Sequence, residues 1–240
     1  MSSELPATDY AEVPDSGDIL NSLCGVCSVP LAERNLLTQV SPFGNRCVLT
    51  GQDESVKLAH LIEKCTKIRR YQFTFGRKLN LNSHWFFVSL ASNLHHQFDT
   101  WKYAFIPTPA LITRIANRLR DEKARRLQLG IQGPWPDYRQ AGWFPITKAG
   151  IDYYFIPLGI HGTIFRHRDL GDPSANSEDF QQLDAPFEGF PTLRLSAHPY
   201  AMVLNAYPKL KKYLKTGPLP SPADSSYQDI KFIYHTVMNT

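Results

Sequence analysis

The chain has 240 residues, of which 42% are hydrophobic and 12% are aromatic, so it can bury a core of its own. Eighteen prolines and only three methionines are atypical of a helical bundle or a coiled coil. The net charge of +4 permits contact with nucleic acid but is too small to imply it. We therefore expect a globular protein of the α+β class.

Residues 1–18 are polar and acidic, and we expect them to form a disordered arm. They contain no apolar core of the length found in signal peptides, and the chain has no apolar run of the roughly 18 residues that a membrane-spanning helix needs. These features predict an intracellular protein of the nucleus or cytoplasm that does not contact a membrane.

The four cysteines allow two interpretations in a chain of this kind. Cys24 and Cys27 form a CGVC pair, and Cys47 with Cys65 would complete four ligands around a structural zinc ion. The second pair is not a CxxC motif, however, and unlinked reduced thiols explain the same residues.

A β-hairpin is the first expected element. The stretch NRCVLTGQDESVKLAHLIEKC predicts a short strand at Arg46 to Leu49, a turn at Gly51 and Asp53, and then a second apolar segment that carries His60.

A helix is expected next, from about residue 91. Leu94 and Phe98 lie four residues apart and would form its buried face, so His95 and Asp99 would share a neighbouring face one helical turn apart. The alternating stretch WKYAFIP then predicts a strand that ends at Pro107.

A basic helix is expected to begin at Pro109, because proline favours the first turn. Its apolar stripe comprises Leu111, Ile112, Ile115, Leu119 and Leu127. Between residues 111 and 129 there are six basic and two acidic residues, a local charge of +6 − 2 = +4. Arg114, Arg118 and Arg125 would contact a phosphate backbone, or this face is simply solvated.

The remaining chain is expected to contain strands at DYYFIPL and GTIFRH, followed by a further mixed α/β part. The lysines of KLKKYLK fit either a localisation signal or the end of an amphipathic helix. We divide the chain into a site-bearing unit at 40–108 and an extension of unknown role at 109–240. The sequence does not predict an oligomeric state.

The expected order of strand, turn, histidine-bearing strand and helix with His-x-x-x-Asp suits phosphodiester hydrolysis. A neutral imidazole can activate water, and a divalent cation can neutralise charge on the scissile phosphate. RCVLTG, KLAHLI and LNLNSHWFFVSLASNLHHQFDTWKYAFIP resemble the HNH endonucleases, in particular the divergent HNH-domain proteins of mushroom-forming fungi, and FPTLRLSAHPYAMVLNA resembles them more loosely. The resemblance covers residues 45 to 108 well and 190 to 206 loosely.

This resemblance implies a ββα-metal core and a metal-dependent endonuclease. His60 matches the general base, while His95 and Asp99 match the metal ligands, with Mg²⁺ as the expected ion. His96 would point about 100° away from His95, toward phosphate or solvent. Nucleic acid, DNA rather than RNA, is the implied partner.

One position departs from the family pattern. The central asparagine, which braces the loop that carries the base, falls on Phe86. The alternative function is therefore a catalytically degenerate HNH-derived module that binds nucleic acid or a protein partner.

Overall fold

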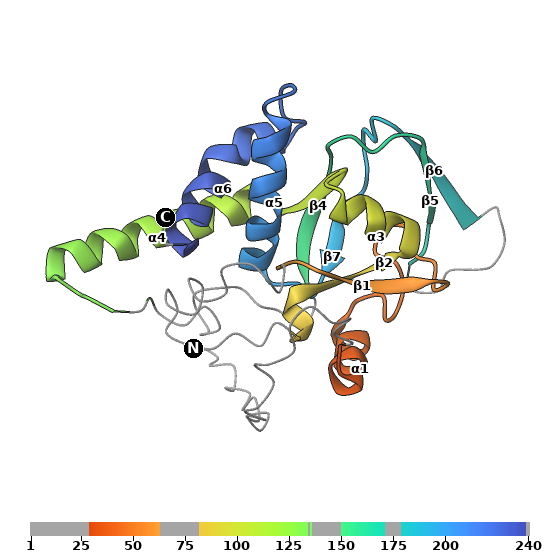
Figure 1. Cartoon of the computed structure of the whole chain (residues 1–240), viewed down its shortest axis with the longest axis horizontal. Helices are drawn as coiled ribbons and strands as arrows, with labels where there is room; N and C mark the ends of the chain where they lie inside the picture. The colour runs from red at the N-terminus through yellow and green to blue at the C-terminus, as the bar shows by residue number, and fades with distance from the viewer. Residues whose placement is uncertain (1–28, 63–81, 134, 136–149, 171–178, 239–240) are drawn as a thin grey trace, which may run out of the picture.

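The computed structural model describes residues 29–62, 82–133, 135, 150–170 and 179–238. Within this part, short antiparallel sheets pack with helices, which confirms the predicted mixed α+β class (Figure 1). The elements are α1 (Leu31–Val40), β1 (Val56–His60), the 3-10 turn η1 (His84–Phe86), β2 (Phe87–Ala91), α3 (Ser92–Asp99), β3 (Tyr103–Pro107), α4 (Pro109–Leu129), β4 (Ile151–Pro157), β5 (Thr163–His167), β6 (Phe180–Asp184), β7 (Leu193–Leu195), α5 (Pro199–Tyr213) and α6 (Ala223–Met238).

The described strands form three antiparallel sheets, which are β1–β2, β3–β4–β7 and β5–β6. Strand β3 belongs to the predicted site-bearing unit at 40–108, whereas β4 and β7 belong to the predicted extension. Helix α5 also packs against β3. The two predicted units therefore share one sheet.

The predicted strand at Arg46 to Leu49 is wrong, because this segment forms a turn. The amide of Cys47 donates to the carbonyl of Gln52 at 2.8 Å, and the amide of Gly51 donates to the carbonyl of Cys47 at 2.7 Å. Gly51 has a φ of 79°, and a Cβ there would lie 2.6 Å from Leu170. The amide of Val48 donates to the carbonyl of Ser89 in β2, and the carbonyls of Val48 and Leu49 accept from Arg166, so the turn is held by distant residues as well as by its own bonds. The strand that pairs with β1 is β2.

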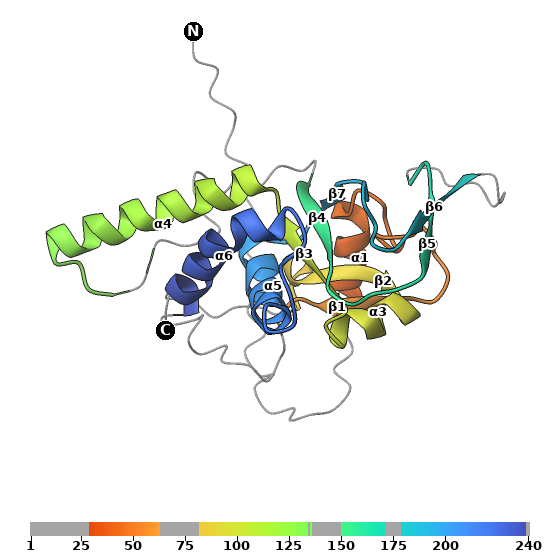
Figure 2. The ribbon, with the colours of Figure 1, turned by 90° about the horizontal axis from the view of Figure 1, so that it is seen from above.

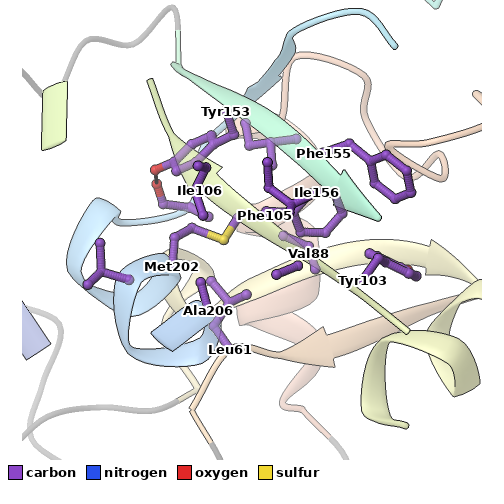
Figure 3. Packing of buried hydrophobic residues seen from close by; sticks show 14 of the residues in the cluster. Leu61, Val88, Tyr103, Phe105, Ile106, Tyr153, Phe155, Ile156, Met202 and Ala206 are labelled. Carbon is purple, nitrogen blue, oxygen red and sulfur yellow. Dashed lines mark hydrogen bonds between the residues drawn. The ribbon is translucent and has the colours of Figure 1, made fainter. Parts of the chain in front are cut away.

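The main core lies between the β3–β4 pair and α5. Figure 3 shows Phe105 of β3 close to Met202 of α5, and Ile156 of β4 and Ala206 of α5 belong to the same core. The rings of Phe105 and Phe155 have centroids 6.3 Å apart. All five residues of β3 are buried, so both faces of this strand are covered. This core fixes the position of β3 and therefore the end of α3, which precedes it.

Helix α4 begins as predicted, with Pro109 in its first turn and the Thr108 side chain accepting from the amide of Leu111 at 3.4 Å. The first four residues of the predicted apolar stripe are buried, but Leu127 is 75% exposed. The C-terminal half of α4 extends away from the helices beside it (Figures 1 and 2). Gly130 ends the helix at a φ of 61°.

Among the described residues, no helix combines the length and the apolar character that a membrane crossing requires.

Candidate functional site

Helix α3 carries the predicted metal ligands on one face. Its apolar residues Leu94 and Phe98 are buried, as predicted, and the Leu94 carbonyl accepts from the Tyr103 hydroxyl at 2.9 Å. His95 Nε2 lies 3.4 Å from Asp99 Oδ2, with the side chains 22% and 61% exposed. The structure therefore brings these two residues together at the surface.

His96, the neighbour of this pair, is exposed. Successive residues of a helix are rotated by about 100°, so its ring does not share the face of His95. The two histidines of the sequence are thus separated by the helix, and a role of His96 toward phosphate stays a prediction.

A buried lysine stands at the C-terminal end of α3. Lys209 of α5 is 4% exposed, and its ammonium donates to the Phe98 carbonyl at 2.9 Å and to the Tyr103 carbonyl at 3.4 Å. The same ammonium lies 3.3 Å from the centroid of the Phe98 ring. A positive charge here complements the negative end of the helix dipole. It also opposes the approach of a second cation to the neighbouring Asp99 carboxylate.

His60 lies on the other face of the β1–β2 pair. It stands opposite Phe87, and the two ring centroids are 4.5 Å apart. Phe87 packs with Val29 and with Leu37 of α1 in a small core of its own. Because alternate residues of a strand face opposite sides, His60 is directed toward α1.

Helix α3 packs against the opposite face. Ala59, the residue before His60, belongs to the main core together with Leu94 and Phe98 of α3. Figures 1 and 2 both place α1 and α3 on opposite sides of β1 and β2. The structure therefore does not bring His60 to the His95–Asp99 pair. A general base must lie within hydrogen-bond reach of the water it activates, directly or through one more water. The catalytic role of His60 stays a prediction that this geometry does not favour.

Phe86 stands at the position where the HNH pattern would have asparagine. It ends η1, is 2% exposed, and belongs to the main core. Its amide donates to the Ser83 carbonyl and its carbonyl accepts from the amide of Leu61, both at 2.9 Å. The side chain is therefore a core residue, and the backbone around it links β1 to the turn before β2.

The donor set on α3 is sparse for a metal ion. Among the described residues, no three His, Cys, Asp or Glu side chains are grouped to hold one. Mg²⁺ prefers oxygen ligands, and the pair of His95 and Asp99 offers one carboxylate and one imidazole. These two residues alone would hold Mg²⁺ only weakly, with water and phosphate in the remaining positions.

The predicted zinc site involves one described residue. Cys47 is a free cysteine with an exposure of 0%. Cys24, Cys27 and Cys65 lie outside the described residues, so the structure does not test that site.

Part of the positive charge on α4 is neutralised by ion pairs. Arg125 donates to both oxygens of Glu122 at 2.8 Å, and Arg126 lies 3.9 Å from the same carboxylate. The hydrogen bond from Arg125 lowers the pKa of Glu122, although burial of the carboxylate acts in the opposite direction. Arg120 pairs with Asp229 of α6 at 2.5 Å. Three of the six basic residues therefore have carboxylate partners.

The other three basic residues of α4 are Arg114, Arg118 and Lys123, and all are exposed. Of the three predicted phosphate contacts, Arg114 and Arg118 retain an exposed charge, whereas Arg125 forms the bidentate pair described above. Sequence spacing alone could have suggested this pair, since Glu122 precedes Arg125 by three residues.

Three of the four lysines of KLKKYLK lie near aromatic rings. The ammonium of Lys212 is 5.0 Å from the ring centroid of Trp101, and that of Lys211 is 6.0 Å from the ring centroid of Tyr207. The stretch lies at the C-terminal end of α5, in agreement with the alternative that placed it at the end of a helix. Of these lysines, the buried Lys209 has the structural role described above.

Comparisons of this chain with protein-family models, with curated proteins and with solved structures find no match. The functional argument therefore depends on the geometry of the described residues.

Proposed function

We propose that this chain is an HNH-derived module that binds nucleic acid and does not use His60 as a catalytic base. The observation that carries the proposal is the placement of His60 and α3 on opposite faces of the β1–β2 pair. A water held by an ion at His95 and Asp99 would be separated from the His60 ring by the sheet itself. The buried Phe86 supports the same conclusion, because it offers no polar group to brace a catalytic loop.

The binding half of the proposal is supported by α4. Its exposed side chains Arg114, Arg118 and Lys123 lie on a helix whose C-terminal half extends outward, where a duplex can approach it (Figure 2). Arginine and lysine side chains bind phosphates without regard to base sequence, and each contact releases a counterion. We expect DNA to bind more tightly than RNA, and we expect the binding to weaken steeply with salt.

The binding test compares two double variants of equal charge. Arg114→Gln with Arg118→Gln removes two exposed charges that share one face of α4, whereas Lys57→Gln with Arg168→Gln removes two exposed charges elsewhere on the molecule. Binding to labelled duplex DNA and duplex RNA is followed by fluorescence polarisation across a salt series. For DNA, the α4 variant should reduce the slope of log K against log salt by about 2, at roughly 0.9 for each lost phosphate contact. Equal slopes for both variants would remove α4 as the interface.

Endonuclease activity is the second candidate, and the 3.4 Å contact between His95 and Asp99 is the observation that favours it. Plasmid nicking with Mg²⁺ and with Mn²⁺ separates the two candidates. We expect wild type and His60→Ala to nick the plasmid equally, at the background rate, and His95→Ala is the control for the metal site. If wild type cleaves the plasmid and both variants do not, the endonuclease function is correct and the proposed binding module is wrong.

A further inference from the structure

A second cationic face, which shares no residue with the proposed α4 interface, lies where α5 and α6 pack side by side (Figures 1 and 2). On α6, Tyr227, Lys231 and His235 follow each other at intervals of four residues, so they share one helical face. On α5, Tyr207 and Lys211 are also four residues apart. Contacts between the two helices show that these faces meet.

Tyr207 is the centre of this cluster. Its ring lies 6.0 Å from the ring of Tyr227, nearly parallel at 24°, and 4.4 Å from the ring of Tyr234. Its hydroxyl oxygen is 3.1 Å from His235 Nε2. Tyr207 is buried, whereas the other two tyrosines and His235 are half-buried. The cluster thus has a fixed interior and aromatic rings that reach the surface.

Two lysines flank the His235 side of the cluster. The ammonium of Lys211 is 6.0 Å from the Tyr207 ring centroid, and Lys231 is one helical turn from His235. Burial of the ring and then the charges of Lys231 and Lys211 lower the pKa of His235. The imidazole is therefore neutral at pH 7.

We propose that this α5–α6 face binds the phosphate group of a nucleotide or of a nucleic-acid strand. The ammonium groups of Lys211 and Lys231, which both act on the pKa of the His235 ring between them, would contact the phosphate oxygens. The half-buried rings of Tyr227 and Tyr234 would contact the base. Lysines combined with aromatic rings are the usual means by which proteins hold a phosphate and its attached base without reading sequence.

The test uses three probes, which are inorganic phosphate, adenosine monophosphate and a short fluorescein-labelled DNA strand. The variant Lys211→Gln with Lys231→Gln is compared with Lys57→Gln with Arg168→Gln, which changes the net charge equally elsewhere. Binding of the small probes is followed through the imidazole resonances of His235, and strand binding through fluorescence polarisation. We expect weaker binding only in the α5–α6 variant. For the strand, the slope of log K against log salt should fall by about 1.4, at roughly 0.7 for each phosphate contact.

A ring variant tests the base contact. Tyr227→Ser should weaken binding of adenosine monophosphate and of the strand at least about fivefold, and it should leave inorganic phosphate unchanged. Thermal melting checks that the variant is folded. Comparable affinity for the nucleotide and the strand would identify a nucleotide site, and binding of the strand alone would identify a nucleic-acid site.

Equal affinities of the α5–α6 variant and its control for all three probes, or a His235 resonance that no probe shifts, would overturn the proposal. The α4 variant Arg114→Gln with Arg118→Gln should leave nucleotide binding unchanged. Failure of this inference is therefore distinguishable from failure of the proposed α4 interface.

Discussion

Replacing Phe86 by asparagine would restore the residue that the HNH pattern has at this position, and we expect it to destabilise the protein. Phe86 is 2% exposed within the main core. Truncation of a buried phenylalanine costs about 3–5 kcal/mol, and a buried amide without full hydrogen bonding adds about 1–3 kcal/mol. The free energy of unfolding should therefore fall by about 4–8 kcal/mol, a large part of the about 5–15 kcal/mol typical of a domain.

Urea denaturation, followed by tryptophan fluorescence, measures this change. The matched control is Phe165→Asn on β5, because Phe165 is 53% exposed and the same atoms are exchanged. We expect a loss of no more than about 1 kcal/mol there. If Phe86→Asn does not fold, the milder Phe86→Leu should still lower the urea midpoint. A loss below about 1 kcal/mol for Phe86→Asn, or a gain of Mg²⁺-dependent nicking, would refute the structural role assigned to Phe86.

Three further predictions concern buried or paired charges. Burial lowers the pKa of His84 to about 4, so the free energy of unfolding should fall as the pH decreases from about 6.5 toward 4, because only the unfolded chain binds the proton in that range. His84→Asn should flatten that part of a plot of the free energy of unfolding against pH. The pKa of Glu122 is lowered mainly by the hydrogen bond from Arg125, so this pair should stabilise the fold above pH 4.5 and lose that effect as the pH falls further. In urea denaturation, Glu122→Gln should remove this contribution to the pH dependence of the free energy of unfolding. Lys209→Met removes the charged donor of the Phe98 and Tyr103 carbonyls and should cost about 1–3 kcal/mol, although the Phe98 carbonyl still accepts from the amide of Trp101. In the same assay, Lys211→Met should change stability by no more than about 0.5 kcal/mol.

Elements with a strong local signal could be predicted from the sequence. Pro109 marks the first turn of α4, and the spacing of Leu94 and Phe98 identifies the buried face of α3. These signals arise from the conformation of one residue or from the period of one helix, so they need no knowledge of distant segments. The strand at Tyr103–Pro107 was also predicted from a local signal, the alternation of residues in WKYAFIP.

Elements that depend on distant partners could not be predicted in this way. The segment at Arg46 to Leu49 has strand-like residues, but Gly51 packs against Leu170, far along the chain, and the local backbone closes into a turn. Likewise, Leu127 continues the apolar spacing of α4 beyond the point where another helix covers it, so it remains exposed. Pattern alone does not say where a packing partner ends.

The proximity of His95 and Asp99 could be predicted from the sequence, whereas the position of His60 relative to them could not. Helical spacing was sufficient to place His95 beside Asp99. Whether His60 joins them depends on which face of β1 its side chain occupies, and a shift of one residue in strand register reverses that face. The sequence around His60 gives no such information, because apolar residues flank it on both sides.

The cross-strand partner of His60 decides its face. His60 stands opposite Phe87, and Phe87 is fixed by its contacts with Val29 and with Leu37 of α1. Ala59 stands opposite Val88 in the main core that also contains the buried side of α3. To bring the His60 ring to the α3 side, the register of β1 would have to shift by one residue, which would move Ala59 out of the core and His60 into it. Burial of an imidazole in place of a methyl group opposes that shift, because the ring nitrogens would need new hydrogen-bond partners there. The same packing that stabilises the β1–β2 pair therefore keeps the predicted base away from the predicted metal ligands.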